Sequence, residues 1–237
     1  SLFCLCWPHT PPVPAKPTDP IDKKSATLES LELMRNRSFA VLVVVAGVIG
    51  IMLAFYFGCE SCFLQDLGVK PERISFYMSF GQIAELAIMG VLPLVVSQLG
   101  VKTTMILGAS AWALRFGLSV VGQPLWLMIA TITLHGFCFA FFFVVAQMYV
   151  DRAASGDIKA SAQSLLVFVV YGIGTVVGNF IAGPLREYFN DDWSRIWAGP
   201  FVLTVICILA FMVLFREEEI AKSERPKSPK RSLGEMV

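Results

Sequence analysis

A glutamine and a glutamate lie three residues apart within a long apolar segment, residues 77–96. Gln82 and Glu85, at positions i and i+3, share one face of a helix. An ionisable group at bilayer depth costs roughly 2.5–3.5 kcal/mol on insertion scales, so it usually faces a bundle interior or a water-filled path. We therefore interpret Glu85 as part of a transport site. The alternative is a structural glutamate that is neutral or paired.

Two further ionisable side chains, His135 and Arg115, occur in other apolar segments. With a rise of 1.5 Å per residue, Glu85 and His135 would each lie ~15 Å, and Arg115 ~9 Å, from the outer membrane surface. One cavity can therefore contain all three. We expect Arg115 to clamp Glu85 or backbone carbonyls rather than to contact a substrate.

Each polar side chain at this depth suggests a particular chemistry. Glu85 can accept hydrogen bonds from sugar hydroxyls or carry a proton, and Gln82 offers donors and acceptors to hydroxyls or base edges. His135 can donate, accept or relay a proton, or simply hydrogen-bond two helices together. Phe139, one turn from His135, can stack on a flat ligand.

The elements that position these residues are membrane-length apolar segments. Hydrophobic residues make up 56% of the 237 residues and charged residues only 16%, too few charges for the surface of a soluble domain. Four segments lack Asp, Glu, Lys and Arg altogether, and each is long enough for a membrane helix of about 20 residues. Two more segments carry one charge each. The sequence therefore predicts an all-α membrane protein with six spans, at residues 38–58, 75–98, 103–121, 125–150, 160–185 and 196–215.

The segments around these spans indicate the topology. Residues 1–7 are typical of the end of a preceding transmembrane helix, residues 8–37 of a central cytoplasmic loop with a short amphipathic helix at 25–36, and residues 216–237 of a disordered cytoplasmic tail. If the first segment is cytoplasmic, the inner loops and tail hold fourteen Lys and Arg and the outer loops four. This bias predicts a multi-pass protein of the cell membrane (inner or plasma) with both termini in the cytoplasm.

Two short motifs are weaker indicators of function than the polar residues within the apolar segments. Cys59 and Cys62 form a single C-x-x-C, which is weak evidence for a metal or redox site and favours free thiols or an incidental disulfide. Gly174 and Gly178 form a small-xxx-small pair that lets two helices approach closely. We expect no metal, no cofactor and no nucleic-acid partner.

Five sequence motifs occur in one order and spacing. They are SFGQIAE at 79–85, LGVKTTM at 99–105, AWALRF at 111–116, LHGFCFAFFFVVAQMYVD at 134–151 and KASAQ at 159–163. Together they resemble the nucleoside:proton symporter family of the major facilitator superfamily, over nearly the whole chain, as helices seven to twelve of its C-terminal half. The resemblance implies two six-helix halves around a midplane cavity. It also implies proton-coupled nucleoside uptake by alternating access, in which the bilayer and an N-terminal six-helix half are partners.

The resemblance also assigns roles to residues. Gln82 and Glu85 match the family's polar substrate contacts on helix eight, and Phe139 matches a phenylalanine of the pocket. His135 stands where well-known members have an aromatic hydroxyl.

The chain departs from the family pattern at three positions. The pattern FDFF reads FAFF at residues 139–142, so Ala140 replaces an acid, and Glu85 is then the only carboxyl within the expected spans. Ala54 and Phe57 stand where some members have amides. These losses favour an alternative, a major facilitator permease for another small polar solute such as a sugar.

Two other classes of protein are also considered. An enzyme is not expected, because the sequence contains neither G-x-S-x-G nor H-E-x-x-H and only one histidine in the spans. A structural or regulatory half-protein, or an incomplete gene product, is the remaining alternative, and the start without methionine favours an incomplete product.

Overall fold

The computed structural model describes residues 31–154 and 158–217. The expectations for residues 1–7 and 218–237 lie outside these ranges. Of the expected amphipathic helix at 25–36, only the last six residues are described, and they contain a short 3-10 helix, η2 (Leu33–Arg35).

Every other regular element in the described ranges is also helical, which confirms the all-α prediction. The elements are α2 (Arg37–Asp66), α3 (Pro71–Val121), α4 (Leu125–Thr131), α5 (Leu134–Cys138), η3 (Phe139–Val144), α6 (Val145–Ala153), α7 (Lys159–Val167), η4 (Phe168–Ile173), α8 (Gly174–Phe189) and α9 (Trp193–Leu214). Elements α4 to α6 form one long helix, Leu125–Ala153, and elements α7 to α8 form another, Lys159–Phe189. Within the described ranges, five helices are long and apolar enough to cross a membrane.

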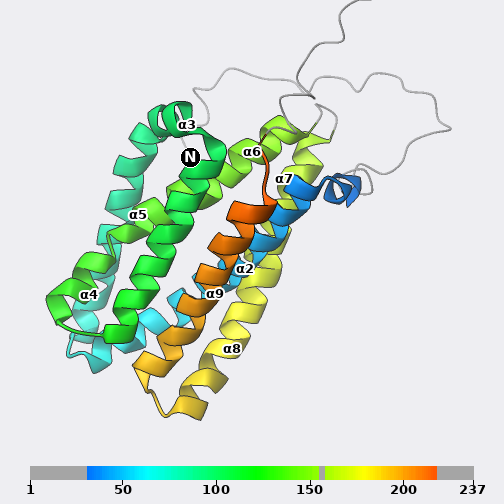
Figure 1. The fold of residues 1–237 in the computed structure, drawn as a ribbon. Helices are drawn as coiled ribbons and strands as arrows, with labels where there is room; N and C mark the ends of the chain where they lie inside the picture. The colour runs from blue at the N-terminus through cyan, green and yellow to red at the C-terminus, as the bar shows by residue number, and fades with distance from the viewer. Residues whose placement is uncertain (1–30, 155–157, 218–237) are drawn as a thin grey trace, which may run out of the picture.

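The 51-residue helix α3 accounts for two of the six expected spans. Gly100 has a φ of 77° and a ψ of 168°, which breaks the helix into two arms. Figure 1 shows the chain reversing at this point. The reversal is tied to the end of α9, because Lys102 Nζ donates to the carbonyls of Met212 and Phe215 at 2.8 and 2.7 Å. A positive φ favours glycine, so the turn between the expected spans 75–98 and 103–121 has a clear physical cause.

Helix α2 is longer than the expected span at 38–58. It begins after Asn36, whose side chain accepts a hydrogen bond from the Phe39 nitrogen at 3.0 Å. It continues to Asp66, because Gly58 is accommodated within the helix and the next break comes at Gly68, with a φ of 96°. Glu60 therefore lies inside the helix and is buried. Glu85 is therefore not the only carboxyl in the membrane-length helices, because the longer α2 also contains the buried Glu60.

Helices pack in pairs around the bundle. Helix α2 packs along α8, and the two arms of α3 pack against α5 and α9. In Figure 1, α9 lies between the second arm of α3 and α8. A Cβ on Gly178 would lie 2.5 Å from the Ile51 oxygen, and one on Gly174 would lie 2.9 Å from the Gly50 carbonyl carbon. The predicted close approach through this glycine pair is confirmed.

Candidate functional site

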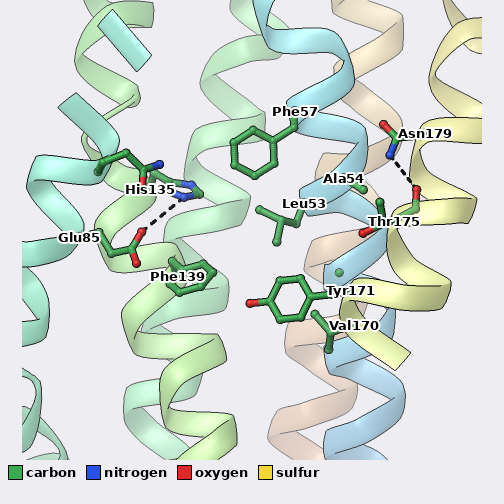
Figure 2. Close-up of a pocket in the computed structure, with 12 residues that line it drawn as sticks. Leu53, Ala54, Phe57, Glu85, His135, Phe139, Val170, Tyr171, Thr175 and Asn179 are labelled. Carbon is green, nitrogen blue, oxygen red and sulfur yellow. Dashed lines mark hydrogen bonds and ion pairs between the residues drawn. The ribbon is translucent and has the colours of Figure 1, made fainter. Parts of the chain in front are cut away.

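A cavity of about 300 Å³ lies between α2, the first arm of α3, α5 with η3, and η4 with α8. Figure 2 shows the side chains that line it from these elements. The lining residues are Gly50, Leu53, Ala54, Phe57, Gln82, Glu85, His135, Phe139, Val170, Tyr171, Thr175 and Asn179. The structure therefore brings together four of the five residues proposed from the sequence, namely Gln82, Glu85, His135 and Phe139.

Glu85 and His135 meet at one wall of the cavity. His135 Nε2 lies 3.9 Å from Glu85 Oε2, and the side chains are 5% and 17% exposed (Figure 2). A Cβ on Gly136 would lie 2.6 Å from the Ala84 carbonyl carbon, so only glycine permits this approach of α5 to α3. The contact between two helices, rather than a loop, thus positions the pair.

Aromatic rings surround His135 on several sides. The ring of Tyr56 stacks on it at 6.1 Å between centroids and an interplanar angle of 25°, and the ring of Trp112 meets it edge-on at 5.9 Å. Phe57 and Phe139 complete the contacts, at 5.7 and 5.9 Å. These contacts fix the orientation of the imidazole and place two phenyl rings where they line the cavity.

Arg115 does not line the cavity, and it pairs with Glu60 rather than with Glu85 or backbone carbonyls, so the expected partners are wrong. That Arg115 has a structural role rather than a substrate contact stays a prediction. Its guanidinium is buried, with Nη2 at 3.6 Å from Glu60 Oε1. The same nitrogen donates to the Tyr56 hydroxyl, and the guanidinium carbon lies 3.8 Å from the centroid of the Tyr56 ring. The reason is the extra length of α2, which places Glu60 beside Arg115.

Three polar residues on η4 and α8, which the sequence reasoning missed, line the cavity opposite Glu85 (Figure 2). Tyr171, Thr175 and Asn179 are spaced at i, i+4 and i+8, so they share one helical face. The Asn179 Nδ2 group donates to the Thr175 carbonyl at 2.9 Å. Their i, i+4 and i+8 spacing was visible in the sequence, but uncharged side chains of this kind also occur in membrane helices where they only bond their own backbone.

The residues that depart from the family pattern have different surroundings. Ala54 and Phe57 line the cavity, where they present apolar groups. Ala140 is fully buried and does not belong to the lining.

Two single π-helical turns, η3 and η4, interrupt the long helices at the level of the cavity. Phe139 begins the first, and Val170 and Tyr171 belong to the second. Such turns often occur at functional sites, because they shift side chains relative to a regular helix. Both turns here supply lining residues.

Within the described ranges, no group of three or more His, Cys, Asp or Glu side chains is arranged to hold a metal. Cys59 and Cys62 are free thiols. The chemical groups that the cavity offers are therefore a carboxyl, an imidazole, two amides, two hydroxyls and aromatic rings.

The family model described as Nucleoside H+ symporter matches residues 1–220. The putative nucleoside transporter YegT of Escherichia coli K12 is 29% identical over 92% of this chain and 54% of its own length. The xanthosine permease of the same organism is 29% identical over 93% of this chain and 57% of its own length. The crystal structure of the nucleoside transporter NupG superposes with a TM-score of 0.72 at 25% identity, over 91% of this chain and 57% of that one. The chain thus spans about half the length of the curated relatives that it matches.

Proposed function

This chain belongs to the nucleoside H+ symporter family, and we propose that it forms the C-terminal half of a secondary active transporter that couples nucleoside uptake to protons. Its fold is that of one six-helix half of a major facilitator superfamily transporter. In such transporters two halves rock about a midplane site, which opens alternately to each side of the membrane. The observation that carries the proposal is the Glu85–His135 pair in a cavity otherwise lined by amides, hydroxyls and aromatic rings.

The side chains that line the cavity suit both the ribose and the base of a nucleoside. Gln82 and Glu85 on one wall, and Thr175 and Asn179 on the other, offer donors and acceptors for ribose hydroxyls and base edges. Phe139 presents a phenyl ring on which a flat base can stack. The cavity volume lies at the lower end of the ~300–1,000 Å³ range of small-molecule sites, as expected if a second half completes the site.

Glu85 is the group proposed to carry the proton, because among the described residues it is the only carboxyl group that lines the cavity. An ionised carboxylate only accepts hydrogen bonds, whereas the protonated form also donates one. Protonation therefore changes both the charge and the hydrogen bonds that the site offers to a substrate. By linkage, a proton and a nucleoside that favour each other at this site are carried together.

The long apolar helices make the chain a multi-pass membrane protein. We propose that it lies in the inner or plasma membrane with both termini in the cytoplasm, as the distribution of Lys and Arg suggests. An N-terminal six-helix half is the proposed partner that closes the cavity.

Uptake of labelled uridine and adenosine tests the proposal. The full-length protein is expressed in cells that lack their own nucleoside transporters, with and without a protonophore. Saturable uptake that the protonophore abolishes is the expected result. A well-inserted protein without nucleoside uptake would contradict it and favour the alternative, a permease for another small polar solute such as a sugar. Ala54 and Phe57, which present no polar group to the cavity, are the observations that favour this alternative.

A further inference from the structure

Glu60 and Arg115 form an ion pair that is buried on both sides, with side chains 2% and 1% exposed. The other ion pairs between described residues have at least one partner that is 17% exposed or more. Neither Glu60 nor Arg115 lines the cavity. The pair therefore carries two buried charges that the proposed substrate contacts do not use.

Tyr56 connects this pair to the cavity. The Arg115 guanidinium donates to the Tyr56 hydroxyl and covers its ring, while the Tyr56 hydroxyl donates to Met78 Sδ at 3.6 Å. The Tyr56 ring also stacks on the imidazole of His135, and His135 lies beside Glu85. A continuous series of contacts thus leads from Glu60 to Glu85.

Several buried polar atoms around Tyr56 have no hydrogen-bond partner among the described residues. They are Glu60 Oε2, Arg115 Nε and Nη1, Trp112 Nε1 and His135 Nδ1. Buried polar groups are rarely left unpaired in proteins, and such a group calls for a physical explanation. These unpaired atoms lie on the residues of the Glu60–Arg115 pair and on residues that contact Tyr56, so they cluster beside the Glu85–His135 pair.

The net charge of Glu60, Arg115 and Glu85 depends on whether Glu85 is protonated. Arg115 contributes one positive charge and Glu60 one negative charge, so together they are neutral. An ionised Glu85 then leaves the assembly with one net negative charge, which a single proton cancels. The titratable or charged groups that face the assembly are Tyr56 and Glu60 from α2, Glu85 and Arg115 from α3, His135 and Cys138 from α5, and Tyr171 from η4.

We propose that Glu60 is a positioning residue for proton coupling, which cancels the charge of Arg115 so that Glu85 and His135 can bind a proton. This inference rests on the proposed function. Without Glu60, the guanidinium charge would already balance an ionised Glu85, and Coulomb repulsion would oppose a further positive charge nearby. Glu60 thus acts through Arg115, and it does not touch the substrate.

The test compares Glu60→Gln with the wild-type full-length protein, reconstituted in vesicles. Two readouts are measured: exchange of labelled for unlabelled nucleoside, and accumulation driven by a pH gradient at a series of external pH values. Glu60→Gln should retain exchange, while half-maximal accumulation moves to lower pH by about one unit, a tenfold rise in the proton concentration required. A merely structural role would lower both readouts without moving the pH profile.

Two further variants keep the test decisive. Glu60→Asp retains the charge and should keep a pH profile close to that of the wild type. The double variant E60Q/R115Q removes both charges and should restore the wild-type profile. If Glu60→Gln does not reach the membrane, the double variant decides, because a shifted profile in it would overturn the proposal.

The failure of this inference differs from the failure of the proposed function. If the wild type transports nucleoside and Glu60→Gln has an unchanged pH profile, the role of Glu60 is overturned alone. If the wild type moves no nucleoside in either assay, the proposed function fails, and this inference fails with it.

Discussion

Gly136 on α5 packs directly against Glu85 on α3, so closely that a Cβ at position 136 would lie 2.7 Å from the Glu85 backbone nitrogen. His135 is the next residue, and the contact therefore sets the separation between its imidazole and the Glu85 carboxyl. The geometry of the candidate proton site depends on a residue that carries no chemistry of its own.

Gly136→Ala should force α5 and α3 apart at this point, because backbone atoms occupy the space that a methyl group needs. Overpacking of this kind costs typically about 1–3 kcal/mol. We expect a lower melting temperature in detergent and weaker nucleoside uptake. Gly90→Ala on the same helix α3 is the matched control, since nothing lies within 4 Å of its Cβ position. Equal behaviour of the two variants would contradict the packing argument.

Glu85→Gln should abolish or uncouple uptake, because the amide keeps the shape of the side chain and cannot take up a proton. The measurement is accumulation of labelled uridine with and without a pH gradient, with the amount of membrane-inserted protein determined in parallel. Gln82→Glu is a useful companion on the same helical face, and it should not rescue Glu85→Gln, since it is the carboxyl at position 85 that lies beside His135. Proton-coupled accumulation at the wild-type level in Glu85→Gln would refute the assigned role.

His135→Ala should raise the KM for nucleoside without unfolding the helices. The imidazole is nearly buried between aromatic rings, and its loss removes a polar contact and frees Phe139 and Phe57 to move. Circular dichroism and size-exclusion chromatography check the fold, and initial rates at several substrate concentrations give the KM. Unchanged uptake kinetics would count against a role for His135 in the site.

Much of this arrangement was predictable from sequence, for a physical reason. Polar side chains inside apolar segments are rare and costly, so Gln82, Glu85 and His135 stood out before their positions in space were known. The long apolar helices followed from segment length, and the Gly174–Gly178 contact followed from small residues at helical spacing.

The rest depended on tertiary packing. Thr175 and Asn179 are uncharged and cost little in a membrane helix, so nothing in the sequence separated them from hydroxyl and amide groups that bond their own backbone. The predicted partner of Arg115 was wrong because the expected span ended at residue 58, before Glu60, whereas helix α2 continues to Asp66. Which carboxylate an arginine meets is decided by how helices cross, and no pattern within one helix contains that information.

Asn179→Ala tests the cavity wall that the sequence reasoning missed. Loss of one hydrogen bond to a bound nucleoside is worth about 0.5–1.5 kcal/mol, so the KM should rise by roughly two- to tenfold. Val176→Ala on the same helix is the control, because Val176 is exposed and does not line the cavity. Comparison of uridine with its 2′-deoxy and 3′-deoxy analogues would identify the hydroxyl that Asn179 contacts. An unchanged KM for every analogue in Asn179→Ala would remove this wall from the substrate site.

Arg115→Gln should destabilise the protein more than any cavity variant. Removal of one partner of a buried ion pair leaves an uncompensated charge on the other and typically costs about 3–5 kcal/mol. Glu60, which is 2% exposed, would then be a buried carboxylate without its cationic partner. The hydrogen bond from Arg115 to the Tyr56 hydroxyl would be lost as well. The double variant E60Q/R115Q should recover most of the lost stability, since no buried charge remains. Thermal unfolding in detergent measures both, and a double variant as unstable as Arg115→Gln would show that packing, rather than charge, holds this part of the bundle together.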